Sequence, residues 1–417
     1  MSRYIFHIDC NSAFLSFQAA YNLSMGHKLD LRKVPAVVGG SQADRRGIVL
    51  AKSIPCKDYG IKTGEPLTQA RDKCPGLIIV PPNYSLYIKC HKALMDILRE
   101  YSPLVQAFSI DEAFLDYTGM ERHFGPCLRG ATLIKDRIRE ELGFTVNIGI
   151  STNKLLAKMA SDFTKPDKVH TLFPQEIPTK LWPLPVERLF MVGRATKAKL
   201  HKLGILTIGD LANYDSELLG WKLKSHGRLI HDYANGIENT PVLPNDNIQM
   251  KGLGNSTTIK FDVDNKKDAH KVLLALVETV ATRLRNEGYG CSVVSVSIKT
   301  HEFLHYSHQR KLATPINNTN ELYRIVTELF DEAWRGEPIR HLGVHVSDLY
   351  PQEFTQYTLF DDIKTRAVSS SLDKAVDVIR KKYGSHSIFR AAYLHSGMPS
   401  MAGGLGVEDY PVMGSIL

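Results

Sequence analysis

The sequence contains no long apolar run and no closely spaced pair of cysteines. None of its 417 residues lies in a stretch near the roughly 20 apolar residues that a membrane-spanning helix needs. The N-terminal segment MSRYIFHIDCNSAF also lacks the pattern of a signal peptide. The cysteines, which form no CxxC motif, are Cys10, Cys56, Cys74, Cys90, Cys127 and Cys291. We therefore expect a cytoplasmic protein with reduced thiols and without a zinc site.

Composition and charge narrow the class of protein only in part. A hydrophobic content of 43% and a charged content of 23% are typical of a globular chain. Its length exceeds what one hydrophobic core supports and predicts about two to four domains. The net charge of +8 suits a polyanionic partner, but many basic enzymes never bind nucleic acid. Charge therefore leaves the function open.

The first part of the chain has the pattern of a mixed sheet. A strand ending at Asp9 precedes a helix, a Gly-rich basic insertion and a second helix over residues 84–100. The segments SIDEAFLDY, LRGATLIKDRIREEL, FTVNIGIS and TNKLLAKMASDF then alternate between strand and helix patterns. This order predicts an antiparallel sheet backed by helices, a split βαβ architecture with a small insertion.

Two Pro-rich stretches divide the rest of the chain. FPQEIPTKLWPLPVE, near residue 174, precedes a compact helical region with two Gly-centred turns. NTPVLPNDN, at 239–247, precedes a mixed region with helices at 268–286 and NELYRIVTELFDEAW and with strands CSVVSVSIKT and HLGVHVSDLY. Val294, Val296 and Ile298 alternate with polar residues, which predicts one core face and one polar face. That polar face can lie against a phosphate backbone or be ordinary solvated surface.

Adjacent carboxylates stand in the apolar stretch SIDEAFLD. Burying an unpaired carboxylate costs several kcal/mol, so Asp111 and Glu112 must be exposed at a turn, paired with a base or bound to a cation. In a split βαβ sheet, Asp9 can lie beside them. Three converging carboxylates need cations, and oxygen ligands favour Mg²⁺. Sites for nucleotidyl transfer commonly hold two Mg²⁺ ions. A solvent-exposed hairpin tip is the simpler alternative.

Several motifs occur in the order seen in Y-family DNA polymerases, the translesion enzymes. They are IDCNSAF, GIVLAKS…CKDYGIKTG, SIDEAFLD and GISTNKLLAKMASDFTKP, and the resemblance covers roughly residues 1–350. The chain resembles most the bacterial polymerase IV and polymerase V catalytic subunits, especially the Gram-positive ultraviolet-resistance type. The resemblance implies a multidomain α+β right-hand fold with a split βαβ palm (1–12 and 84–173), small fingers (13–83), a helix-hairpin-helix thumb (174–240), a linker (241–250), a second split βαβ sheet called the little finger (251–350) and a tail (351–417).

The resemblance also implies the catalytic groups. Asp9 and Asp111 would bridge two Mg²⁺ ions, Glu112 would complete one site, and the backbone carbonyl of Cys10 would add a ligand. Phe14 matches the steric gate, an aromatic ring that clashes with a ribose 2′-hydroxyl. Without the resemblance, Phe14 would be read as an ordinary core residue.

The triphosphate contacts depart from the family pattern. Lys57 and Lys165 match its two phosphate-binding basic positions, and the backbone amides of Asn11, Ser12, Ala13 and Phe14 open a helix that can receive an anion. Ala51 and Ile54 stand where many members have Thr and Tyr. Lys52 or Ser53 is the expected substitute for the missing hydroxyl groups.

Two further segments match DNA and protein contacts of the family. Gly193, Ala195 and Lys197 lie in the expected hairpin, where backbone N–H groups bind DNA phosphates, although Ala195 replaces the usual second Gly. Gln356, Leu359 and Phe360, in QYTLF, resemble the peptide by which bacterial polymerases bind the sliding clamp.

The resulting hypothesis is a low-fidelity, template-directed DNA polymerase that bypasses damage. Its expected cofactor is Mg²⁺, and its expected partners are primer–template DNA, dNTPs and the sliding clamp, with a recombinase filament or accessory subunits as further candidates. The alternatives are a palm-type nucleotide cyclase, a non-catalytic DNA-binding repair factor, a catalytically dead relative and a polymerase subunit that needs accessory proteins for activity. DNA-dependent incorporation of nucleotides separates the polymerase from each of them.

Overall fold

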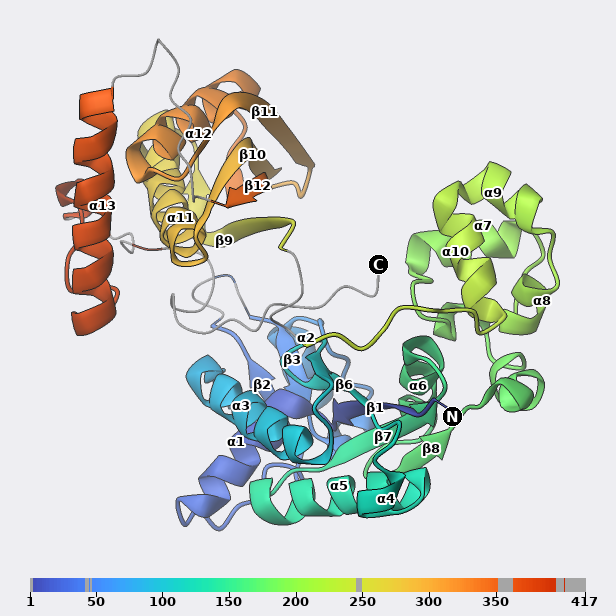
Figure 1. Cartoon of the computed structure of the whole chain (residues 1–417). Helices are drawn as coiled ribbons and strands as arrows, with labels where there is room; N and C mark the ends of the chain where they lie inside the picture. The colour runs from blue at the N-terminus through green and yellow to red at the C-terminus, as the bar shows by residue number, and fades with distance from the viewer. Residues whose placement is uncertain are drawn as a thin grey trace. The chain divides into compact units, whose positions relative to one another are not determined.

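The computed structural model describes residues 3–41, 45, 47–244, 250–351, 363–394 and 401, with residues 363–366 described as backbone only. The chain forms two compact units (Figure 1). Of the described residues, the first contains 3–39 and 49–244, and the second contains 250–351, 363–394, 401 and those between 40 and 48. Each is described by itself.

A five-stranded sheet forms the centre of the first unit. Its order is β5-β6-β1-β7-β8, and all neighbours are antiparallel except β7 and β8. The strands are β1 (Ile5–Cys10), β5 (Val105–Ala107), β6 (Glu112–Asp116), β7 (Val146–Ser151) and β8 (Val169–Thr171). The split βαβ palm expected from the sequence is therefore confirmed.

Helices cover both faces of this sheet. On one face, α3 (Tyr84–Tyr101) and α5 (Cys127–Leu142) pack against Phe6 and Ile8. On the other, α6 (Lys154–Ser161) packs against Ile5 and Phe114. Because side chains alternate along a strand, His7 and Asp9 point to the α6 face with Ile5, and Glu112 does so with Phe114. The short helix α4 (Glu121–Phe124) precedes α5.

The segment inserted between β1 and α3 forms a small subdomain. It contains α1 (Ala13–Ser24), α2 (Leu67–Lys73), the 3₁₀ turn η1 (Ile54–Lys57) and a sheet in the order β3-β2-β4. The strands are β2 (Ala36–Gly39), β3 (Val49–Lys52) and β4 (Ile78–Val80). Two small apolar clusters, around Val37 and Val38, hold these elements together.

The remainder of the first unit is helical. It consists of α7 (Arg194–Lys202), α8 (Ile208–Ala212), α9 (Ser216–Leu223) and α10 (Ser225–Ala234), preceded by the turns η2 (Pro174–Glu176), η3 (Ile177–Leu181) and η4 (Val186–Arg188). Gly204, at φ +77°, makes the turn that leads from α7 to α8. Thr207 caps α8 in a capping box with Asp210.

The second unit is a four-stranded antiparallel sheet with two helices on one face. Its order is β11-β10-β12-β9, formed by β9 (Gly252–Val263), β10 (Tyr289–Thr300), β11 (His305–Ile316) and β12 (Ile339–Pro351). Helices α11 (Lys266–Asn286) and α12 (Thr319–Ala333) cover the face on which Val294, Val296 and Ile298 are buried. The predicted core face is confirmed. A third helix, α13 (Ile363–Tyr383), and the turn η6 (Ala391–Tyr393) follow.

Two expectations about absences can be compared with the described residues. All six cysteines have free thiols in the structure. In the described part of the chain, each helix is too short or too polar to cross a bilayer.

Candidate active site

The three predicted carboxylates lie at one end of the first sheet. Asp9, at the end of β1, is paired in register with Glu112, the first residue of β6. Asp111 occupies the turn just before β6, and its carbonyl accepts a hydrogen bond from the backbone N–H of Cys10 (3.0 Å). Residues more than a hundred positions apart are therefore adjacent through the strand pairing.

Two of the three carboxylates, those of Asp9 and Glu112, are each in contact with a different lysine. The ammonium of Lys165 donates to Asp9 Oδ2 and lies 2.8 Å from Asp162 Oδ1. Lys158 Nζ lies 2.7 Å from Glu112 Oε2. The Lys158 ammonium also stands 4.9 Å from the centre of the Phe108 ring and 5.5 Å from that of Phe190. These two cations offset part of the cost of holding Asp9 and Glu112 in their ionised forms.

Burial and charge separate the pKa values of the three acids. Burial, helped by the negative charges of Glu112 and Asp162, raises the pKa of Asp9 to about 6 although Lys165 opposes it. Burial also raises the pKa of Asp111, whose Oδ1 accepts a hydrogen bond from Ser109 Oγ (2.6 Å). For Glu112 burial acts in the same direction, but contacts with His7 and Lys158 outweigh it and lower the pKa to about 2.

His7 lies directly behind Glu112. Its side chain is fully buried, Nδ1 is 2.8 Å from Ser161 Oγ, and Nε2 is 3.6 Å from Glu112 Oε2. Burial lowers the pKa of this imidazole. Ser161 belongs to α6, so His7 connects the helix that carries Lys158 to the strand that carries Asp9. His7 therefore acts on the site through Glu112.

The oxygen donors at this site fit a hard divalent cation. Among the described residues, no three His, Cys, Asp or Glu side chains are gathered around one point as a metal cluster. Burial disfavours the ionised form of Asp9, and a divalent cation bound there would favour it. The Cys10 thiol is buried, and burial raises its pKa well above its usual range, so only its carbonyl remains as a potential ligand. Carboxylate and carbonyl oxygens are the ligands that Mg²⁺ prefers.

Phe14 stands near the start of α1 and is held by two tyrosines of α3. Its ring stacks on Tyr87 (centroids 4.5 Å apart, planes 8° apart) and meets Tyr84 edge-on at 6.0 Å. Tyr87 is fully buried, whereas Phe14 is only partly buried. The ring of Phe14 is therefore rigidly oriented and still accessible, as a steric gate requires.

Asn11 is used inside the protein. Its backbone N–H donates to the Thr145 carbonyl (2.9 Å), and its side-chain oxygen accepts from the N–H of Asp167 (2.9 Å). Asn11 is therefore not available to a phosphate in this structure, and it instead holds the turn that carries Lys165. Ser12, in the left-handed region at φ 49°, precedes the first turn of α1, where Ala13 and Phe14 lie.

The side chains expected to compensate for Ala51 and Ile54 have structural partners. Ser53 is buried, and its hydroxyl donates to the Val34 carbonyl (2.7 Å). The Lys52 ammonium donates to the carbonyl of Ile61. Lys57 ends the turn η1 with an exposed side chain, so it remains the basic group of this subdomain that we propose for the triphosphate.

The residues predicted to contact DNA lie at the start of α7. Gly193 caps α7 and, like Ala195, is exposed, whereas the Lys197 ammonium is paired with Glu187 (2.5 Å). An exposed helix start can offer N–H groups to a phosphate. Gln356, Leu359 and Phe360 lie outside the described residues.

The raised pKa of Asp9 predicts how stability depends on pH. A carboxyl group whose pKa is higher in the folded than in the unfolded chain stabilises the fold below pH 3.8 and loses that effect as pH rises through about 6. In chelator, we expect the native chain to lose about 2 kcal/mol relative to Asp9→Asn between pH 4 and pH 7. Urea unfolding of both proteins at each pH measures this difference, and parallel pH profiles would contradict it.

Reasoning from the sequence did not identify Lys158 or His7. The available signal was a lysine within the mostly apolar segment KLLAKMAS, all eight residues of which are buried in the structure. A lysine on a fully buried helix requires an internal acid, and Glu112 was an obvious candidate. The alternation along IFHID similarly places His7 on the same face as Asp9.

Comparison with known proteins places these features in a family. The sequence model described as the impB/mucB/samB family matches residues 8–162, its C-terminal domain matches 250–359, and the HHH motif of the IMS family matches 174–205. The chain is 46% identical to a DNA polymerase IV of Clostridium acetobutylicum over 94% of its own length and 99% of the relative. It is 36% identical to DNA polymerase IV 1 of Bacillus subtilis over 94% of both chains.

A solved structure shares the fold. A Y-family DNA polymerase chimera of Dbh and Dpo4 aligns with a TM-score of 0.71 at 22% identity, covering 84% of this chain and 99% of that one. This agrees with the observed sheet, helical segment and second sheet. The family fold also implies a mechanism that depends on a divalent metal. The chain belongs to the impB/mucB/samB family, the Y-family of DNA polymerases.

Proposed function

We propose that this protein is a template-directed DNA polymerase of the low-fidelity, translesion type. The observation that carries the proposal is the pairing of Asp9 with Glu112 on one sheet face, with Asp111 in the adjoining turn. Acidic groups brought together from separate chain segments, at a cost in repulsion, point to a bound cation rather than to a stabilising role. Family membership identifies the reaction as the transfer of a dNMP to a primer 3′ end.

Asp9, Asp111 and Glu112, with the carbonyl of Cys10, would hold two Mg²⁺ ions. When bound, the ions neutralise charge on the attacking hydroxyl and on the triphosphate. Lys165 is close enough to contact Asp9, so its ammonium is well placed for the phosphate groups of a bound dNTP. Burial opposes the charge on Lys165, but Asp9 and Asp162 outweigh it and raise its pKa, so it stays protonated.

The small inserted subdomain supports low fidelity. Its three strands have only three or four residues each, and the small residue Ala51 stands where the family resemblance leads us to expect a hydroxyl group. A small, sparsely contacting surface makes few contacts that depend on the shape of the new base pair. We therefore expect misincorporation and bypass of damaged templates.

A non-catalytic DNA-binding factor explains the site less well. Such a factor has no need for buried, mutually repelling acids at the end of a sheet. A nucleotide cyclase accounts for the acids but not for the helix-hairpin-helix segment or the second sheet, both of which match family domains.

Primer extension tests the proposal directly. The native chain is incubated with Mg²⁺, primer–template and single or mixed dNTPs, on undamaged and abasic templates, beside Asp9→Asn. We expect incorporation that follows the template base, continues past the abasic site and is lost in the variant. A native chain that binds primer–template and adds no nucleotide, even with a sliding clamp, would overturn the proposal.

Phe14 is proposed as the steric gate, since Tyr87 holds its ring rigidly. Phe14→Ala is expected to raise the ratio of ribonucleotide to deoxyribonucleotide incorporation by roughly a hundredfold. A rigid clash discriminates against the 2′-hydroxyl by about 1–3 kcal/mol or more, and the variant loses this discrimination. Separate kcat/KM measurements for dCTP and CTP give the ratio. Tyr84→Ala, which removes an edge contact of the same ring, is the control and should change the ratio much less.

We further propose that Gln356, Leu359 and Phe360 bind the sliding clamp. Adjacent apolar anchors in such a peptide supply most of the binding free energy. Replacing Leu359 and Phe360 by Ala is expected to abolish clamp-stimulated extension while leaving extension without clamp unchanged. Equal stimulation of both proteins would exclude this segment. DNA contacts by Gly193, Ala195 and Lys197 remain part of the same proposal.

A further inference from the structure

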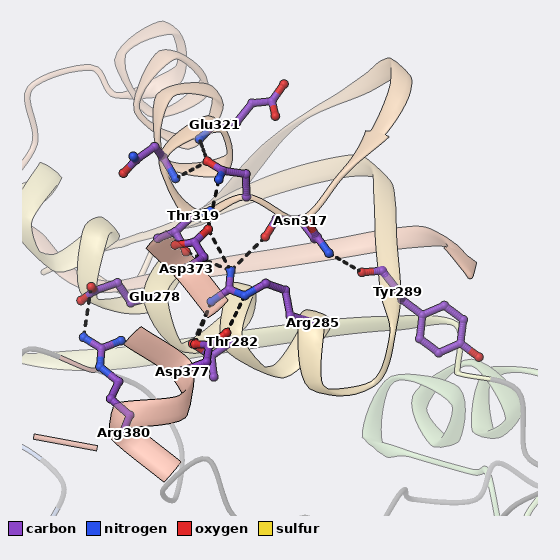
Figure 2. Close-up of polar contacts among 12 residues, drawn as sticks. Glu278, Thr282, Arg285, Tyr289, Asn317, Thr319, Glu321, Asp373, Asp377 and Arg380 are labelled. Carbon is purple, nitrogen blue, oxygen red and sulfur yellow. Dashed lines mark hydrogen bonds and ion pairs between the residues drawn. The ribbon is translucent and has the colours of Figure 1, made fainter. Parts of the chain in front are cut away.

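Helix α13 packs on the rest of the second unit through its polar side. Figure 2 shows Arg285, on α11, between two aspartates of α13. Arg285 Nε and Nη2 donate to the two carboxylate oxygens of Asp377 (2.7 and 2.9 Å), and Nη1 donates to Asp373 Oδ2 (3.3 Å). This paired geometry is the strong form of an arginine–carboxylate contact and fixes the rotation of α13 about its axis.

A second set of contacts fixes the same orientation. Asp373 Oδ2 also accepts from the backbone N–H of Thr319 at the start of α12 (2.8 Å), where a negative charge is favourable. Near the other end of α13, Arg380 Nη2 donates to Glu278 Oε1 on α11 (3.3 Å), as Figure 2 also shows. Tyr393, in η6, donates to the other oxygen of Glu278 (3.2 Å). Asp373, Arg380 and Glu278 are all buried.

The apolar side of α13 is left facing outward. Asp373, Asp377 and Arg380 follow the four-then-three spacing of one helix face, and Val368, Leu372 and Ala375 follow the same spacing on another face. Val368 is 70% exposed and Leu372 55% exposed. None of the side chains described on α13 belongs to a hydrophobic cluster of the protein. The usual arrangement of an amphipathic helix is therefore reversed.

The charges on the outward side have one sign. Both acids of the described part of α13, Asp373 and Asp377, face Arg285, whereas the exposed charged side chains are Lys374, Lys381 and Lys382. Val378, which is 66% exposed, extends this apolar surface toward Lys374 and Lys381 along one edge, and Lys382 lies beside Ala375. A helix that packs there would bury the stripe and place its own flanking residues beside the lysines.

We propose that the outward surface of α13 is a docking site for an acidic amphipathic helix of a partner protein. Apolar residues of the partner cover the exposed side chains from Leu372 through Val368 and Ala375 to Val378, and its acidic residues along one edge meet Lys374, Lys381 and Lys382. A second copy of this chain fits less well, because its own lysines would oppose these. A DNA backbone fits less well because it leaves the apolar stripe uncovered. The proposal is independent of the polymerase activity.

Two synthetic peptides test the surface on the full-length chain. Both have about 20 residues, long enough to be helical in water, and share one apolar stripe with i, i+4, i+7 spacing. One carries Glu on both flanks of the stripe and the other carries Lys. Fluorescence anisotropy of each labelled peptide measures binding to the native chain, to Leu372→Asp and to Leu218→Asp. Leu218 is a matched control, since it is 53% exposed on α9 in the first unit.

We expect the Glu peptide to bind the native chain and the Leu218→Asp control equally. The Leu372→Asp variant is expected to bind the Glu peptide more weakly than the native chain does, by roughly tenfold or more. The native chain is expected to bind the Lys peptide more weakly than the Glu peptide by a similar factor. Thermal unfolding and primer extension of Leu372→Asp should match the native chain, because an exposed side chain is changed.

Three results would overturn the proposal. The first is that the native chain binds both peptides equally, or that Leu372→Asp binds the Glu peptide as tightly as the native chain does. The second is a native chain that dimerises in sedimentation experiments and becomes monomeric in Leu372→Asp, which would assign the surface to a second copy. The third is a loss of duplex DNA binding in Leu372→Asp without peptide binding to the native chain.

Discussion

Glu112→Gln is expected to reduce the rate of nucleotide incorporation by about a thousandfold or more, and to lower the free energy of unfolding at pH 7 by about 3 kcal/mol. The loss of rate follows from removing a carboxylate from a site that must neutralise a triphosphate. The loss of stability follows from the pKa of Glu112, which is lowered from 4.5 to about 2 in the folded chain. A lowered carboxyl pKa contributes stability above pH 4.5, and this contribution is lost as pH falls through 2 or when the charge is removed.

Lys158→Met separates the two effects. It removes the 2.7 Å contact with Glu112 but keeps the carboxylate, so stability should fall while incorporation falls much less than in Glu112→Gln. In the double variant, the two stability losses should not add, because each single change already breaks the same ion pair. Single-turnover extension and urea unfolding of the four proteins measure both quantities. If Glu112→Gln keeps more than about a tenth of the native rate, Glu112 is not part of the catalytic centre.

Gly149→Ala is expected to destabilise the first unit by about 3 kcal/mol or more. Gly149 lies on β7 beneath α6, and an added Cβ would lie 1.9 Å from the Ala157 carbonyl oxygen and 2.5 Å from the Ser161 nitrogen. Both atoms belong to the backbone of α6, so the whole helix must move. Since α6 carries Lys158, activity should fall together with stability.

Gly76→Ala provides the control for this change. No atom lies within 4 Å of a Cβ placed on Gly76, and its backbone is outside the left-handed region. The same substitution there should alter stability by no more than about 0.5 kcal/mol. Urea unfolding of the two variants beside the native chain makes the comparison. A Gly149→Ala protein as stable as Gly76→Ala would mean that α6 and β7 are not packed this closely.

The sequence alone predicted that Asp9, Asp111 and Glu112 lie together at one end of the first sheet. The strand ending at Asp9 and the SIDEAFLD hairpin predicted the neighbours that the register of β1 and β6 contains. The buried strands β10 and β12 were also recognised, because their apolar residues alternate strictly. These features follow from local patterns that one buried face imposes.

The features that the sequence did not predict depend on contacts between distant residues. Strands β9 and β11 were not predicted, because they carry many polar residues, as HYSHQRKLATPI in β11 shows. They join the sheet only by pairing with β12 and β10, respectively. The docking of α13 was missed for a related reason. Asp373, Asp377 and Arg380 have the composition of a solvated helix face, and only Arg285 and Glu278 on α11 make that face the buried one.

The pairing of β1 with β6 and β7 also determines when this active site can form during synthesis. Asp9 leaves the ribosome early, yet its strand neighbours arrive only with residues 112–116 and 146–151. The intervening loops must be closed before these contacts form, and closing long loops slows folding. The subdomain that contains α1, α2 and η1 completes its own sheet at residue 80 and precedes the catalytic sheet in the chain. The nascent polymerase therefore acquires its carboxylate cluster only once residues 112–116 have been made, and completes the sheet around it with residues 146–151.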